Sequence, residues 1–151
     1  MVSINKAPVI RYFEEGYAVG TKTGVLNGKV LYVSVIPKFN VTITKIFVNC
    51  PTVSSNGRAA LYSGAPTTLL SESGSQALVA GGNFFTLATP QALTAGTVYW
   101  VALQLGAASD YVYTFSVTSG YVFYESLAYG AFPATATPVA YTVQIRAGIL
   151  S

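Results

Sequence analysis

Short segments rich in β-branched and aromatic residues, separated by glycine, proline and asparagine, constrain the fold of this chain more than any other feature. Lys29 to Ile36 reads KVLYVSVI and stops at Pro37, which cannot continue a central strand. Asn27-Gly28 and Asn56-Gly57 are turn signals, because both residue types tolerate a positive φ angle. No helical repeat of useful length interrupts the pattern. The sequence therefore predicts an all-β chain.

About nine such segments follow one another with connections of ordinary length, which is typical of an antiparallel sandwich or barrel. They are residues 29–36, 40–49, 58–63, 68–71, 83–87, 97–105, 111–117, 121–125 and 139–147. A chain of 151 residues is long enough for one domain with one core. We therefore expect a single antiparallel β-sandwich of about eight to ten strands, formed by residues 29–151.

The most apolar stretch, LTAGTVYWVALQL, runs from Leu93 to Leu105 and is too short to span a bilayer as a helix. Within TVYWVALQ, both the odd and the even positions are largely apolar. A strand with two apolar faces lies centrally in a sandwich and is covered on both sides. The pattern predicts a central strand here, with Trp100 as a core or interface residue.

The side chains needed for catalysis are scarce. Histidine is absent, the chain has one cysteine, and its five carboxylates are scattered. Glu14 and Glu15 are adjacent, so on an extended chain they point to opposite faces. We expect no enzymatic activity, no metal and no cofactor. Cys50, at the end of the apolar run IFVNC, is predicted to be a buried thiol.

Charge is unusually sparse: charged residues make up 9% of the chain, against about 25% in an average soluble domain. The net charge of +3 comes without a cluster of Lys and Arg, so we expect no nucleic-acid partner. No signal peptide is visible at the N-terminus. Eleven tyrosines and eight phenylalanines exceed what one small core needs. Because few charges keep sheet edges apart, we expect the surface to associate with copies of the same chain.

Residues 1–28 differ from the rest, because they carry charges and aromatic residues without clear alternation beyond PVIRYF. They are predicted to form either an arm that lies across a neighbouring molecule or an ordinary edge strand of their own sheet. Arg11, Tyr12 and Phe13 are the candidate interface residues of this segment.

The connection SLAYGAFPATATP, from Ser126 to Pro138, is long, uncharged and aromatic. Long loops without structure of their own are usually functional or disordered. We expect an exposed aromatic recognition loop there, with Tyr129 and Phe132 in the loop and Tyr121 and Tyr124 in the preceding segment.

The order GKVLYVSVIP…NVTITKIFVN…GRAALYSGAPTTLLSES…NFFTLATPQALTAGTVYWVALQL resembles a loose family of small jelly-roll β-sandwich domains in virus tail, turret, baseplate and decoration proteins. Its signature strand L-x-x-G-x-x-Y-W-x-A is matched by Leu93, Gly96, Tyr99, Trp100 and Ala102. The resemblance covers about residues 29–105. It implies a jelly-roll-like fold and a place on a particle surface, and it brings no catalytic or ligand residue with it.

Three functions remain open at this point. The first interpretation is a non-enzymatic structural subunit of a virion surface, such as a capsid, turret, decoration or tail-associated protein. It would form a closed homo-oligomer, such as a trimer or pentamer, and contact other virion proteins. The second is a carbohydrate- or receptor-binding module that contacts a cell-surface glycan. The third is a subunit of an extracellular filament whose N-terminal strand is donated to the next copy.

Overall fold

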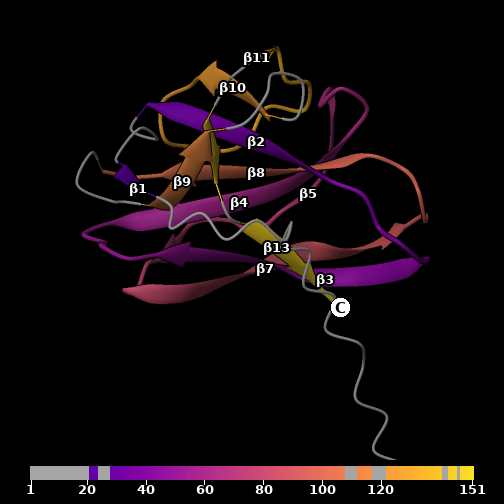
Figure 1. Cartoon of the computed structure of the whole chain (residues 1–151), viewed down its shortest axis with the longest axis horizontal. Helices are drawn as coiled ribbons and strands as arrows, with labels where there is room; N and C mark the ends of the chain where they lie inside the picture. Colours follow the sequence, from indigo (N-terminus) through magenta and orange to yellow (C-terminus); the bar gives the residue numbers. More distant parts are fainter. Residues whose placement is uncertain (1–20, 24–27, 108–111, 117–121, 141–142, 146) are drawn as a thin grey trace, which may run out of the picture.

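The computed structural model describes residues 21–23, 28–107, 112–116, 122–140, 143–145 and 147–151. These residues form strands and loops without a helix, and every strand pairing among them is antiparallel (Figure 1). The strands are β1 (Thr21–Thr23), β2 (Lys29–Val35), β3 (Val41–Cys50), β4 (Asn56–Ser63), β5 (Thr68–Glu72), β6 (Gln76–Ala77), β7 (Gly81–Leu93), β8 (Tyr99–Leu105), β9 (Val112–Ser116), β10 (Val122–Ser126), β11 (Val139–Ala140), β12 (Val143–Ile145) and β13 (Ala147–Leu150). The predicted all-β sandwich is confirmed, and a jelly-roll order of connections stays a prediction.

The larger sheet has the strand order β11-β10-β2-β8-β4-β5, and β6 pairs with β4 beside it. Strand β8 lies in the middle, between β2 and β4, and every residue from Tyr99 to Leu105 is buried. The predicted central strand is therefore confirmed. Trp100 is buried as well, and its indole N–H donates a 2.7 Å hydrogen bond to the carbonyl of Gly64.

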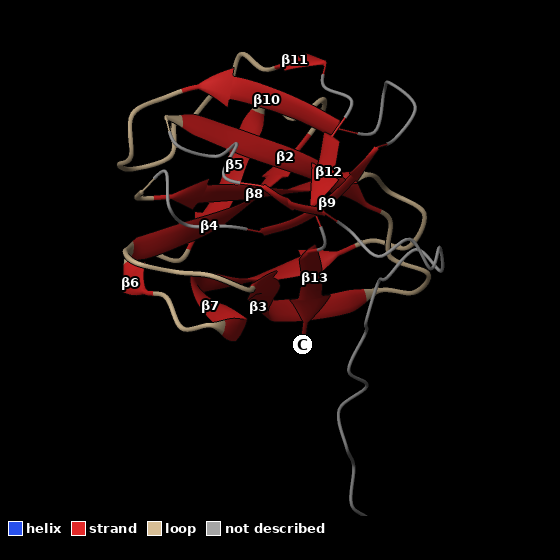
Figure 2. Cartoon of the chain, turned by 60° about the vertical axis from the view of Figure 1, so that its left-hand side comes forward, coloured by secondary structure: helices blue, strands red, loops and turns tan. Residues whose placement is uncertain are grey.

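The second layer contains the three-stranded sheet β13-β3-β7, which lies below the larger sheet in Figure 1. A further three-stranded sheet, β1-β9-β12, adjoins it, because one residue separates β12 from β13 in the chain (Figure 2). Strand β1 belongs to the region predicted as an arm or edge strand, and it forms the outer strand of its sheet. Arg11, Tyr12 and Phe13 lie outside the described residues.

Two apolar clusters hold these layers together. The inner cluster fills the space between the sheets with side chains such as Leu31, Leu61 and Val101 from one sheet and Ile46 and Phe85 from the other. It also contains Cys50, so the predicted buried thiol is confirmed. The outer cluster lies on the opposite face of the larger sheet and comprises Val30, Tyr32, Ala60, Tyr62, Trp100, Ala102, Phe132 and Ala136. The larger sheet is therefore apolar on both faces, which explains the two-sided pattern of its sequence.

The prediction of a turn at Asn56-Gly57 is wrong, because both residues begin strand β4. Gly57 does not have a positive φ angle; its role is close packing. A Cβ atom at this position would lie 2.7 Å from Cδ2 of Leu78 and 3.1 Å from Cζ of Phe85. At the other predicted turn, Gly28 does adopt a positive φ of 67°, the conformation that favours glycine.

Strand β7 is longer than the predicted segment 83–87 and continues through Pro90. Its pairing with β3 is interrupted after Thr86 and resumes at Gln91, opposite a register shift between Ile43 and Lys45. Pro90 falls in this interruption, where the missing N–H costs no ladder hydrogen bond. Next to it, the backbone N–H of Thr89 donates to Oγ of Ser71 on β5.

Candidate functional site

Residues 127–138, the outer loop, cover the outer face of the larger sheet. Phe132 is 5% exposed and its ring meets the ring of Tyr62 edge to face, with 6.5 Å between centroids. Ala136 is buried in the same cluster. The prediction of an exposed aromatic side chain is therefore wrong for Phe132, because the outer face of β2, β8 and β4 is apolar and this loop is what covers it.

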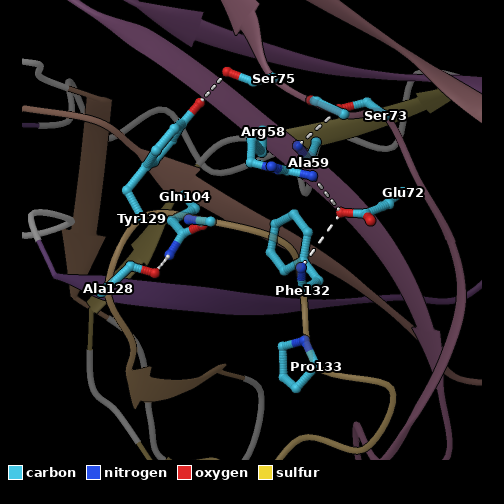
Figure 3. Close-up of polar contacts among 12 residues, drawn as sticks. Arg58, Ala59, Glu72, Ser73, Ser75, Gln104, Ala128, Tyr129, Phe132 and Pro133 are labelled. Atoms are coloured by element: carbon cyan, nitrogen blue, oxygen red, sulfur yellow. Dashed lines mark hydrogen bonds and ion pairs between the residues drawn. The ribbon is translucent and has the colours of Figure 1, made fainter.

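Gln104 fastens the beginning of the outer loop to the centre of the sheet (Figure 3). Its buried side-chain amide donates to the carbonyls of Leu127 and Ala128, at 3.3 Å and 2.8 Å. Its Oε1 accepts from the backbone N–H of Gly130 at 3.1 Å. One polar side chain in an otherwise apolar strand thus satisfies three backbone groups of the loop.

Replacing Gln104 with leucine is expected to lower the free energy of unfolding by about 2 kcal/mol, because leucine leaves those three loop groups without their partner. Chemical denaturation monitored by tryptophan fluorescence measures the change. Gln91→Leu is the matched control, since the Gln91 amide makes an exposed hydrogen bond; its expected effect is below about 0.5 kcal/mol. Equal effects of the two substitutions would contradict this role of Gln104.

The middle of the outer loop is held by a carboxylate and a phenol. Oε2 of Glu72 accepts from Nη2 of Arg58 at 3.0 Å and from the backbone N–H of Phe132 at 3.4 Å (Figure 3). The hydroxyl of Tyr62 donates to the carbonyl of Pro133 at 2.6 Å. These bonds join β4 and β5 to the outer loop. The half-buried ion pair Arg58–Glu72 therefore has a structural role.

Two buried tyrosines form the polar centre of the outer cluster. The rings of Tyr32 and Tyr62 meet edge to face at 5.3 Å between centroids, and the Tyr32 hydroxyl donates to Oε2 of Glu125 at 3.0 Å. Burial raises the pKa of both phenols well above the ordinary value, and for Tyr32 the nearby Tyr62 and Glu125 add to the rise. At physiological pH both phenols are therefore neutral hydrogen-bond donors.

The remaining residues of the predicted recognition loop do not meet on one exposed surface. Tyr124 packs against the inner cluster, on the opposite side of the sheet from Phe132, and Nζ of Lys29 lies 5.1 Å from its ring centroid. Tyr129 is half-buried, with its hydroxyl 2.7 Å from Oγ of Ser75 (Figure 3). Tyr121 lies outside the described residues. These aromatic residues were predicted to form one exposed recognition surface. Those that the structure describes instead make separate contacts, on different sides of the larger sheet.

The outer face of the smaller sheet carries an exposed aromatic side chain. Phe84 on β7 is 52% exposed, and its ring lies 5.2 Å from that of Phe47, its register partner on β3. Gly82 makes room for the Phe47 ring, because a Cβ atom there would lie 2.8 Å from Cε2 of Phe47. Lys45 is the only charged residue in the sequences of β3, β7 and β13. We call Phe84, Thr86, Phe47, Lys45 and Gly82 the β7 surface.

Sequence reasoning identified a strand here and missed the exposed surface. The signal was present, because Asn83, Phe85 and Leu87 alternate with Phe84 and Thr86. The first three are buried and the other two are exposed. Alternation divides the side chains of a strand between two faces. The face with the larger apolar content is the one expected to point to the core.

A second exposed apolar area lies at one end of the sandwich. Ile36 and Phe39 in the β2–β3 connection and Val98 before β8 are 45%, 46% and 40% exposed. Two hydrogen bonds hold the connections side by side: the N–H of Gly96 donates to the carbonyl of Pro37, and that of Ala95 to Oδ1 of Asn40. This end of the molecule therefore also presents apolar side chains to solvent.

Within the described ranges, no group of three or more His, Cys, Asp or Glu side chains is placed to hold a metal ion. The same ranges contain no helix long and apolar enough to cross a membrane. Comparisons with models of protein families, with curated proteins and with solved structures find no match to this chain.

Proposed function

We propose that this chain is a non-enzymatic structural subunit that assembles with copies of itself. The observation that carries the proposal is the difference between the two sheets. The apolar outer face of the larger sheet is covered by a fastened loop of its own chain. The smaller sheet presents Phe84 to solvent on strands that hold a single charge, Lys45. A sheet surface with few charges has little electrostatic repulsion to prevent association with another copy.

The chemistry of the polar groups supports the same proposal. The Arg58–Glu72 pair, the Tyr32 hydroxyl with Glu125, and Gln104 all contact other groups of the fold. Several of these contacts hold the outer loop, and the raised pKa of each buried phenol keeps it neutral. Groups that hold a loop of their own fold contribute to the shape of the molecule, and a subunit of a particle depends on its shape.

The proposed location is the surface of a virus particle. It is supported by the resemblance of residues 29–105 to jelly-roll domains of virion proteins, and by the sandwich architecture that those domains require. The proposed partners are further copies in a closed ring, such as a trimer or pentamer, and neighbouring virion proteins. Self-association is the part of the proposal that can be measured on the purified chain.

Light scattering coupled to size-exclusion chromatography tests the proposal through the molar mass of the full chain. We expect a discrete mass that is a small multiple of the chain mass of 15.9 kDa. Because the proposed contact is nearly uncharged, the mass is expected to persist when salt is raised from about 0.1 to about 1 M, where exposed ion pairs are screened. A monomer at every concentration would contradict the proposal, and selective binding of that monomer on a glycan array would favour a carbohydrate-binding module.

Substitution of Phe84 by lysine is expected to raise the dissociation constant of self-association at least tenfold, because a charge would have to be desolvated in the contact. A tenfold change corresponds to about 1.4 kcal/mol of binding free energy. Val139→Lys is the matched control. Val139 is 53% exposed and lies on β11, at the far edge of the other sheet, at the top of Figure 1. Sedimentation velocity measures both dissociation constants. Weakening by Val139→Lys alone would move the interface to the β11 edge.

A further inference from the structure

We propose that residues 8–13 of one copy add as a strand to the edge of β7 in a neighbouring copy. This inference rests on the proposed self-association and names its surface and its occupant. The occupant is the segment PVIRYF, which lies outside the described residues. The acceptor is the half of β7 from Gly81 to Leu87, together with the exposed Phe84.

The acceptor is an edge of a sheet. Strand β7 ends the order β13-β3-β7 and pairs with β3 along one side. On its other side, alternate residues of an antiparallel strand direct N–H and C=O groups away from the sheet. The second half of β7 is occupied there, because Thr89 donates to Ser71 of β5. The first half, Gly81–Leu87, has no described strand on that side.

The acceptor half of this edge carries neither charge nor proline, two of the features that usually prevent strand addition. Natural edge strands carry Lys, an inward-pointing charge, proline or a covering loop. From Gly81 to Leu87 the sequence is GGNFFTL, with no charge and no proline. Phe84 and Thr86 are exposed on one face, and Phe85 and Leu87 are buried on the other. An added strand would therefore find an apolar neighbour on both faces.

The segment 8–13 has the composition that such an edge accepts. Ile10 and Tyr12 fall on one face of an extended chain, and Val9 and Phe13 fall on the other. Main-chain hydrogen bonds would supply affinity, and alternate side chains would supply specificity. The alternation and the apolar content of the segment thus match those of the acceptor edge.

The direction of β1 fixes the point from which the N-terminal segment leaves the described structure, and the cross-linking experiment below distinguishes a neighbouring copy from the same chain. From Val143 to Leu150 the chain pairs first with β9 and then with β3. Strand β1 pairs with β9 in the same sense as β12, through Thr21↔Thr114 and Thr23↔Val112. Thr21, the residue of β1 to which the N-terminal segment is joined, is therefore the end of β1 that lies farther from β3.

The length of the connection suffices for such an exchange. Seven residues, 14–20, separate Phe13 from Thr21. Extended, they reach up to about 24 Å, more than twice the ~10 Å separation of packed sheets. Residues 8–13 can therefore leave one sandwich and reach the surface of a molecule in contact with it.

Cross-linking between two full-length variants tests the contact directly. Ile10→Cys and Thr86→Cys are mixed under assembling conditions and treated with a short bis-maleimide. Because each chain carries one added cysteine, a heterodimer forms only when the segment of one copy lies near β7 of another. The native Cys50 is buried, and the unmodified chain gives its background. We expect at least tenfold more heterodimer than from Ile10→Cys mixed with Val139→Cys.

The outcomes separate this inference from the proposed function. Equal yields from the two mixtures, in a protein that assembles, would overturn strand addition and leave self-association standing. Cross-links found only when Ile10→Cys and Thr86→Cys share one chain would place the segment on its own molecule and overturn the exchange. A monomeric mass in light scattering would instead contradict the proposed self-association itself.

A second pair of variants does not depend on cross-linking chemistry. Ile10→Asp is expected to weaken self-association at least tenfold, because it places an unpaired carboxylate against the apolar edge. Val2→Asp makes the same change of charge outside the proposed strand and is expected to have less than a twofold effect. Circular dichroism verifies that both retain the β spectrum. Equal weakening by both, or by neither, contradicts the proposal.

Discussion

Replacement of Phe132 by alanine is expected to lower the free energy of unfolding by about 3 to 5 kcal/mol, the range for removal of a buried phenylalanine. Phe132 is 5% exposed and lies against Tyr62 in the outer cluster. Its loss opens a cavity beneath the outer loop, which several hydrogen bonds hold in place and thereby keep from collapsing. Urea denaturation of the variant and of the unmodified chain measures the difference.

Tyr129→Ala is the matched control, because Tyr129 is in the same loop and half-buried, with a hydroxyl that makes an exposed contact with Ser75. We expect a loss of about 1 kcal/mol or less. The comparison distinguishes a covering loop from an exposed recognition loop. If Phe132→Ala left stability unchanged and abolished binding of a glycan, the recognition loop predicted from the sequence would be correct.

Raising the pH from 9 to 11 is expected to lower the free energy of unfolding by about 3 kcal/mol through Tyr32 and Tyr62 alone. Burial raises the pKa of both phenols in the folded protein, whereas in the unfolded chain they ionise near 10. Above pH 10 the unfolded state therefore binds fewer protons than the folded state, and stability falls as pH rises. Each phenol contributes a slope of up to about 1.4 kcal/mol per pH unit.

Tyr62→Phe isolates one of the two contributions. The variant loses the hydrogen bond to Pro133 at every pH, so its stability is expected to start about 1 kcal/mol lower. Its decrease between pH 9 and 11 is expected to be smaller than that of the unmodified chain by about 1.4 kcal/mol. Denaturant titrations at four pH values measure both slopes. Parallel slopes would show that Tyr62 ionises equally well in the folded and unfolded states.

The central part of the fold could be predicted from sequence because its signals are local. The two apolar faces of TVYWVALQ predicted a central strand, and Tyr99–Leu105 is buried throughout. Likewise, KVLYVSVI before Pro37 corresponds to β2, Lys29–Val35. In both cases the alternation of side chains and the nearby chain-breaking residues belong to the same short segment, so no distant contact was needed to interpret them.

The site could not be predicted in the same way, because its contacts are distant in sequence. The apolar and aromatic composition of the outer loop is compatible with exposure and with burial. What decides between them is the apolar outer face of β2, β8 and β4, which requires a cover. Gln104 reads as an ordinary polar position, and its role depends on carbonyls 23 and 24 residues later. The turn prediction at Asn56-Gly57 was wrong because this glycine allows Leu78 and Phe85, which are distant in sequence, to pack closely against the backbone of β4.

Hydrogen–deuterium exchange of the full chain, measured below and above the concentration at which its mass increases, tests self-association through the β7 surface most directly. Peptides that cover Gly81–Leu87 are expected to exchange at least tenfold more slowly in the assembled protein, because new partners protect the amides on the free edge of β7. Peptides that cover β11 are expected to exchange at the same rate in both states. An assembly in which Gly81–Leu87 exchanges as in the monomer, or a chain that never assembles, would contradict the proposal.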